Sequence, residues 1–247
     1  GADGVTPIGR PLHERLAPAA IRSAAGLGRG PRGAAPTTLV SAVLARLAAD
    51  GRLGPYADPD GAASSSPDGV LAAALLRAAQ VHRLAGAPAA ADGLLVRALE
   101  LAPDDPGILN DLGYTRLEAA DRVDPAVAGL IERAHRLDPG SAAITDSLGW
   151  LRYRQGRLDD GPDGEPGALS LLERAAATAD APTGEILLHL GDARWRAGDR
   201  AGAAEAWRRG ARLDGSDAHR TNTERRLRAL QEGVWGVLVR DPGRMYD

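Results

Sequence analysis

A short pattern built on Leu-Gly returns three times in the second half of the chain and constrains its fold more than any other feature. The copies are Leu112-Gly113-Tyr114, Leu148-Gly149-Trp150 and Leu190-Gly191-Asp192. The first two glycines are 36 residues apart and the last two are 42 apart. Each copy is followed by a cluster built on a small residue, at Ala134, Ala175 and Gly210. A period this long, with two helical patterns in each unit, indicates an array of helical repeats.

The third unit shows the pattern most fully. Its key positions are Leu187, Leu190, Gly191, Gly198, Ala203 and Trp207. Gly191 and Ala203 are small, as expected where two helices cross closely, and Gly198 can take the left-handed conformation that ends a helix. In these positions the chain resembles the tetratricopeptide repeat family, whose unit of about 34 residues has Leu-Gly early and Ala in the middle. The resemblance implies an all-α, right-handed solenoid of antiparallel helix pairs.

The repeats divide the chain into four parts. Helix pairs are expected at 69–85 with 88–101, 106–119 with 124–137, 142–155 with 166–178, and 184–197 with 200–213, which gives about four units over residues 69–214. Residues 1–36 are predicted to be a flexible Gly/Pro/Ala-rich segment. A helix and a loop, forming a degenerate or preceding repeat, are expected at 37–68. Residues 215–247 are predicted to hold a capping helix, at about 217–232, and an apolar tail at 234–239 that docks on the body.

Two helix starts and one long turn follow from local chemistry. Asp105 and Asp124 each precede a proline, so they are expected to cap helices whose first turn holds Pro106 or Pro125. The run Asp159–Gly167 lengthens the turn inside one unit. Because this run is polar and rich in Gly and Pro, we expect it to be dispensable for folding.

Charge and composition exclude several classes of function. The chain has 30 basic and 33 acidic residues and a net charge of −3, which gives no electrostatic case for binding nucleic acid or an anionic membrane. Every basic side chain except histidine is Arg, which excludes a phosphate-binding or Schiff-base lysine. The absence of Cys excludes thiol catalysis and thiolate metal sites. No apolar run is long enough for a transmembrane helix.

Catalytic and metal-binding patterns are not found. The five histidines have no metal-ligand spacing among them, and no GxSxG motif occurs. The acidic pairs Asp104-Asp105 and Asp159-Asp160 sit in turns, where Asp caps helices and solvates loops. We therefore expect no enzyme activity, no metal and no cofactor.

The resemblance also implies a binding surface, because the first helix of each tetratricopeptide unit lines a concave groove. The predicted groove residues are Arg77, Gln80, Asn110, Tyr114, Leu117, Asp146, Trp150, Tyr153, Arg154, His189, Asp192, Trp195 and Arg196. We expect Trp150 to face the groove and Trp207 to lie in the core. Some family members clamp a terminal carboxylate with Lys, Arg and Asn, but here Lys is missing and Asp192 would oppose an anion, so that clamp is not predicted.

The sequence therefore predicts a non-catalytic scaffold or adaptor that binds a protein or peptide. The strings around Asn110–Tyr114 and Asp146–Trp150 resemble a bacterial envelope subgroup, whose members act as adaptors or lipoprotein partners of processing proteases. One alternative is the interaction module of a longer enzyme or envelope-assembly protein, and another is an enzyme on a helical scaffold. The chain starts at Gly1 and is expected to lack its native N-terminus. A soluble periplasmic or cytoplasmic protein is expected, and the oligomeric state stays open.

Overall fold

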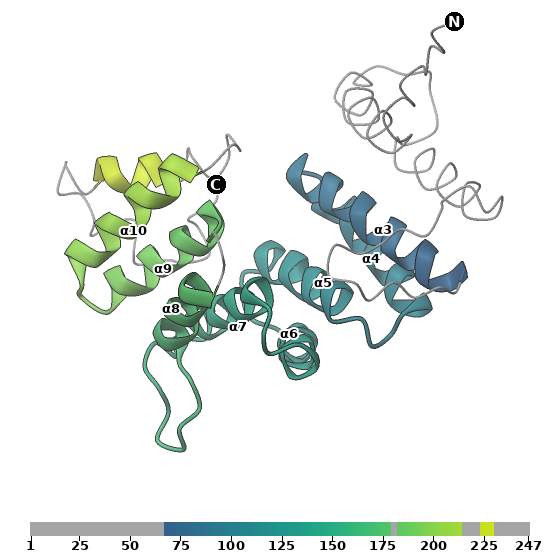
Figure 1. The fold of residues 1–247 in the computed structure, drawn as a ribbon, viewed down its shortest axis with the longest axis horizontal. Coiled ribbons are helices and arrows are strands. Elements are labelled where there is room, and N and C mark those ends of the chain that lie inside the picture. The colour runs from purple at the N-terminus through teal and green to yellow at the C-terminus, as the bar shows by residue number, and fades with distance from the viewer. Residues whose placement is uncertain (1–66, 179–181, 214–222, 230–247) are drawn as a thin grey trace, which may run out of the picture. The chain divides into compact units, whose positions relative to one another are not determined.

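A computed structural model describes residues 67–178, 182–213 and 223–229 (Figure 1). The helices are α3 (Pro67–Leu84), α4 (Pro88–Leu101), α5 (Pro106–Ala119), α6 (Pro125–Leu137), α7 (Ala142–Arg154), α8 (Ala168–Thr178), α9 (Gly184–Arg196) and α10 (Arg200–Leu213). Residues 223–229 are also helical, inside the predicted final helix, and the described residues contain no strand. Each helix from α3 to α10 begins and ends within two residues of the predicted bounds. The all-α prediction is therefore confirmed.

The chain divides into two compact units, residues 1–94 and residues 95–247. In the second unit α5 packs with α6, α7 with α8, and α9 with α10. The pairs are also stacked, because α6 contacts α7, α8 contacts α9, and α7 contacts both α5 and α9. This arrangement is a repeat array in which the central first helix, α7, touches the first helices of both neighbouring repeats. The predicted pairing of α3 with α4 stays a prediction, since the division falls inside α4.

Side-chain caps and a left-handed glycine set helix ends as the sequence predicts. Asp105 accepts a hydrogen bond from the backbone N–H of Ile108, and Asp124 accepts one from Ala126. These bonds satisfy donors that the first turn of a helix leaves unpaired. Gly198 follows α9 with φ of +89°, a conformation in which a side chain would be strained.

The repeated glycines lie where the two helices of one unit cross. A Cβ atom added to Gly113 would lie 2.6 Å from a side-chain carbon of Ile131, and one added to Gly149 would lie 2.7 Å from Leu172. At Gly191 the nearest atom would be the indole Nε1 of Trp207, at 2.2 Å. The Leu-Gly pattern is therefore explained by the close approach of the two paired helices at each glycine. Trp207 itself is 0% exposed, which confirms its predicted place in the core.

First and second helices are buried in different ways. Helix α7 buries every residue from Ile144 to Leu151, whereas α8 buries only four residues along one stripe. The main core cluster joins apolar residues of α5 to α10 and includes Trp150 and Tyr153. The first helices α5, α7 and α9 are thus the inner layer of the stack, and the second helices form its outer layer.

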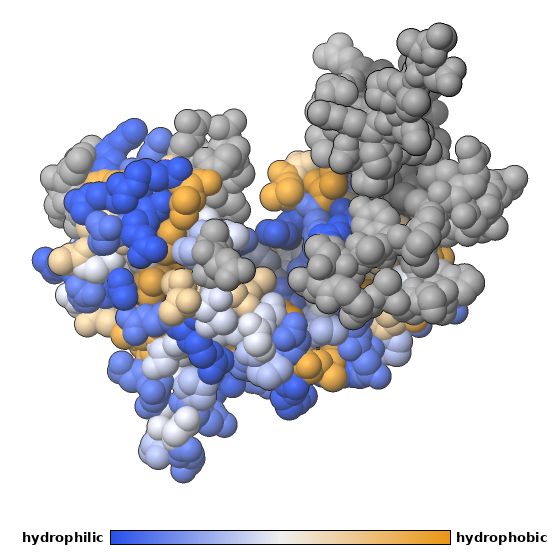
Figure 2. All heavy atoms as spheres, viewed as in Figure 1, coloured by the Kyte–Doolittle hydropathy of each residue, from blue (hydrophilic) through white to orange (hydrophobic). Residues whose placement is uncertain are grey.

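The long turn between α7 and α8 has a packed base and an exposed tip. Asp160 accepts a hydrogen bond from the backbone N–H of Gly167, and Arg157 pairs with Glu165. Residues 162–166 are exposed, and Figures 1 and 2 show this hydrophilic loop projecting from the helices. The base packs closely, because a Cβ at Gly167 would lie 2.3 Å from the carbonyl oxygen of Asp159. Dispensability of the turn stays a prediction, which the exposed tip favours.

Some predictions fall outside the described residues. These are the flexible segment 1–36, nearly all of the segment 37–68 and the apolar tail 234–239. Within the described ranges, no helix combines the length and the apolar character needed to cross a membrane.

Candidate functional site

Aromatic and charged side chains of α5, α7 and α9 meet on one face of the inner layer. We define the first-helix face by seven residues that contact one another there: Tyr114, Glu118, Asp146, Trp150, Tyr153, Glu185 and His189. Five of them were predicted as groove residues. The prediction that these residues share one face is consistent with the contacts that join them across three repeats.

The predicted exposure of this face is wrong for most of its residues. Trp150 is 0% exposed, Tyr153 is 3% exposed and His189 is 1% exposed. The predicted residues Asn110, Tyr114, Leu117, Asp146 and Asp192 are also buried. The physical reason is that α7 packs against both α5 and α9, so residues aligned with the groove lie between these helices. Trp150, expected to face an open groove, belongs to the core.

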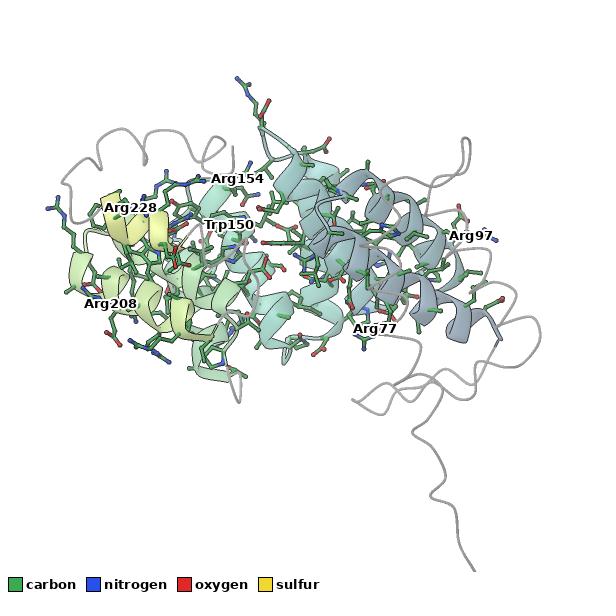
Figure 3. All side chains as sticks on the ribbon, turned by 90° about the horizontal axis from the view of Figure 1, so that it is seen from above. Arg77, Arg97, Trp150, Arg154, Arg208 and Arg228 are labelled. Atoms are coloured by element: carbon green, nitrogen blue, oxygen red, sulfur yellow. The ribbon has the colours of Figure 1, made fainter. Side chains whose placement is uncertain are left out.

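Trp150 joins the three first helices. Its ring stacks on Tyr153 with centroids 4.8 Å apart and on His189 with centroids 4.2 Å apart, and both ring pairs are nearly parallel. Its Nε1 donates a hydrogen bond of 2.7 Å to Oε1 of Glu118 (Figure 3 shows Trp150 on its helix). A buried indole N–H normally finds such an acceptor.

His189 is held by a buried ion pair. Its Nδ1 lies 3.0 Å and 3.1 Å from the two carboxylate oxygens of Asp146. Its Nε2 lies 3.4 Å from the hydroxyl of Tyr114. Burial disfavours the charged ring, but the carboxylates of Asp146, Glu185 and Glu118 outweigh it and raise the pKa of His189 to about 9. The imidazole is therefore protonated and paired at neutral pH.

Two further carboxylates complete the face. Glu185 accepts a 2.7 Å hydrogen bond from the hydroxyl of Tyr114 and is half-buried. Glu118 keeps 25% of its side chain exposed, and burial raises its pKa despite the nearby charges of His189 and Arg154. The sequence interpretation missed both residues. Glu118 could have been found, since it lies four residues after Tyr114 and so on the same side of α5.

Arg154 and Arg196 have the same structural role in successive repeats. Arg154 donates to the backbone carbonyls of Leu117 and Ala120 at the end of α5, at 3.3 Å and 2.6 Å. Arg196 donates to the carbonyl of Tyr153 at 3.2 Å and lies over its ring. Each arginine thus adds a side-chain donor at the end of the preceding first helix, where the carbonyls of Leu117 and Tyr153 also accept from backbone N–H groups. Both were predicted as groove residues, and both tie neighbouring repeats together.

The remaining predicted residues lie elsewhere. Asp192 accepts from Nε1 of Trp207 at 3.1 Å and pairs with Arg226 through two contacts of 2.5 Å, an anchor that the sequence did not reveal. Trp195 is half-buried against Trp207. Arg77 and Gln80 lie on α3 in the other unit, where they share a hydrogen bond of 3.1 Å. Among the residues that the structure describes, no cluster of three or more His, Asp or Glu side chains suits a metal ion.

Three stacked antiparallel helix pairs, with small residues at each crossing and charged side chains on the inner helices, define a helical-repeat solenoid. The period and the Leu-Gly positions are those of tetratricopeptide repeats, which this solenoid resembles. TPR repeat-containing protein PA4667 of Pseudomonas aeruginosa is 39% identical to it over 90 residues. That match covers 36% of this chain and only 14% of that relative. No protein-family model matches the chain.

Solved structures of MamA also resemble the chain. MamA MSR-1 is 18% identical, with a TM-score of 0.40, and the match covers 72% of this chain and 96% of that one. MamA AMB-1 is 19% identical, with a TM-score of 0.39, covering 72% and 91%.

Proposed function

We propose that the chain is a non-catalytic scaffold or adaptor that binds a protein or peptide along the inner layer formed by α5, α7 and α9. Repeat solenoids present extended surfaces of this kind to their partners. The fold is that of a protein-interaction module. The kind of partner and the use of the inner layer as the binding surface are our proposal.

One observation carries the proposal. In α5 to α10, the buried polar and charged residues are Asn110, Thr115, Thr145, Asp146, Ser147, His189 and Asp192, and all of them lie on first helices. The second helices bury only apolar side chains and glycine. Burying polar groups costs stability unless they are bonded, so a purely structural inner layer would be expected to be apolar as well. This asymmetry between the two layers supports a role for the first helices beyond packing.

The arrangement of His189 favours binding over catalysis. One ring nitrogen faces the Asp146 carboxylate, the other faces the Tyr114 hydroxyl, and the side chain is 1% exposed. A general base must reach the proton that it removes from a substrate. This histidine is enclosed by protein groups on both sides.

A second candidate is an interaction module within a longer enzyme or envelope-assembly protein. The Pseudomonas relative favours it, because the matched repeats are 14% of that protein. In this case the inner layer would recruit a partner for chemistry done by another domain.

Photo-crosslinking tests the proposed surface. A benzophenone amino acid replaces the half-buried Glu185 of α9 or, as a control, the exposed Arg208 of α10 (Figure 3). Each protein is exposed to an unbiased random-peptide library and irradiated. Peptides should be captured at position 185 and not at position 208. Capture at position 208 alone, or at neither position, would refute binding along the inner layer.

A further inference from the structure

We propose that the long turn between α7 and α8 is an interaction element whose partner is a second copy of this chain. Its acidic side chains dock on the arginine-rich outer side of α10 in the other copy. This contact goes beyond binding along the inner layer and uses different residues. The turn is a feature that the repeat itself does not need, since it lengthens the spacing between Leu-Gly copies from 36 residues to 42.

The turn is held in shape by its own hydrogen bonds. The backbone N–H of Gly161 donates to the carbonyl of Glu165 at 2.8 Å, and that of Gly167 donates to the Asp160 carboxylate at 2.8 Å. Residues 162–166 are nevertheless exposed and project from the helices (Figure 1). An ordered loop loses little conformational freedom when it binds, which favours this folded turn over a flexible acidic peptide as the ligand.

Carboxylates dominate the charge of the turn. Residues 157–167 contain four acidic side chains and one arginine. Glu165 pairs with Arg157 inside the turn. Asp159 and Asp163 are exposed, and among the described residues none forms an ion pair or a side-chain hydrogen bond with either carboxylate. The turn therefore presents two carboxylates that are available to a cation on another molecule.

The outer side of α10 has the opposite charge. Arg208, Arg209 and Arg212 are exposed near the end of this helix, and Glu205 is its one acidic residue (Figure 3 labels Arg208). Positions three, four and seven residues apart share a side of a helix, so the four side chains form one stripe with an excess of positive charge. Within the described ranges, no carboxylate forms an ion pair with any of the three arginines.

Charge complementarity between these two surfaces identifies the second copy as the partner. In one chain no described ion pair joins them, because the turn leaves the stack between α7 and α8 whereas α10 packs on α9. Such a contact is heterologous, so every added copy still offers a free turn or a free α10, and the assembly extends into a ring or a filament. Exposed ion pairs are individually weak and screened by salt, so association should depend on protein concentration and on ionic strength.

Sedimentation velocity of the full chain tests for this association. At low salt the weight-average mass should rise between about 10 μM and about 1 mM protein, the range in which weak contacts form. At about 500 mM salt the mass should return to that of the monomer. A mass that stays monomeric at low salt, or association that survives high salt, would overturn the electrostatic contact.

Charge-reversed variants locate the contact. Asp159→Arg with Asp163→Arg reverses the charge of the turn, and Arg209→Glu with Arg212→Glu reverses that of α10. Each variant alone should stay monomeric, because its turn and its α10 then carry like charges. An equimolar mixture of the two should associate again, because the α10 of the first variant meets the turn of the second.

A matched control separates this contact from a general effect of charge. Arg122→Glu with Arg136→Glu changes the net charge as much as the α10 variant does, at exposed positions on and beside α6. This control should associate as the unmodified chain does. An equal loss of association in the control, or no recovery in the mixture, would overturn the pairing of the turn with α10.

Discussion

Adding one methyl group at Gly191 should destabilise the chain strongly. The Cβ of Gly191→Ala would lie 2.2 Å from Nε1 and 2.3 Å from Cδ1 of Trp207, whereas ordinary contacts are 3.4–4 Å. The indole cannot yield easily, because it is 0% exposed and its Nε1 donates to Asp192. Helices α9 and α10 must therefore move apart, or the indole must shift and loosen that hydrogen bond.

Three contributions set the expected change in the free energy of unfolding for Gly191→Ala. Overpacking a close-packed core costs about 1–3 kcal/mol, and the contact at Gly191 is short enough to place it near the upper end. Weakening a buried hydrogen bond to a carboxylate adds part of about 1.5–3 kcal/mol. The better helix propensity of Ala returns about 1 kcal/mol. The net loss in the free energy of unfolding should be about 2–4 kcal/mol.

The chain contains a matched control for this substitution. Gly129 is also inside a helix, α6, but a Cβ there would meet no atom within 4 Å. Gly129→Ala should therefore stabilise by about 0.5–1 kcal/mol, the same substitution with the opposite sign. Urea denaturation followed by tryptophan fluorescence measures both. A Gly191→Ala chain as stable as the unmodified one, or a Gly129→Ala chain that is equally destabilised, would refute the close helix crossing at Gly191.

Three further predictions concern the face, its titration and the long turn. Trp150→Ala should lower the free energy of unfolding by about 3–5 kcal/mol in urea, because its ring is fully buried; near-normal stability would place it outside the core. Since the pKa of His189 is raised to about 9 from an ordinary 6.5, its contribution to stability should be complete below about pH 6.5 and lost as the pH rises through 9. His189→Gln should flatten that decline, and an unchanged slope would contradict the assignment. Replacing residues 162–166 by a short Gly-Ser link should leave the Tm nearly unchanged. Gly167→Ala should lower the Tm, because its Cβ would meet the carbonyl oxygen of Asp159. A larger loss of Tm from the loop replacement than from Gly167→Ala would show that the tip packs.

The helices could be predicted because their signals are local. Asp105 and Asp124 stand directly before the prolines that open α5 and α6, and their carboxylates accept from the first turn as expected. Gly198 adopts the left-handed conformation that its place after α9 implies. The small residues at 113, 149 and 191 predicted helix crossings because no side chain fits between helices that approach so closely.

The sequence by itself therefore determined the repeat and its helix bounds, and periodicity predicts the face of α7 on which Trp150 lies. Whether that face is open or covered depends on how closely neighbouring helices stack, which no local pattern records. Only the tertiary structure could place His189 from one repeat between Asp146 and Tyr114 from two others. It also decided that Arg154 donates to backbone carbonyls at the end of a neighbouring helix, because the stacking of the repeats brings its guanidinium within hydrogen-bond distance of them.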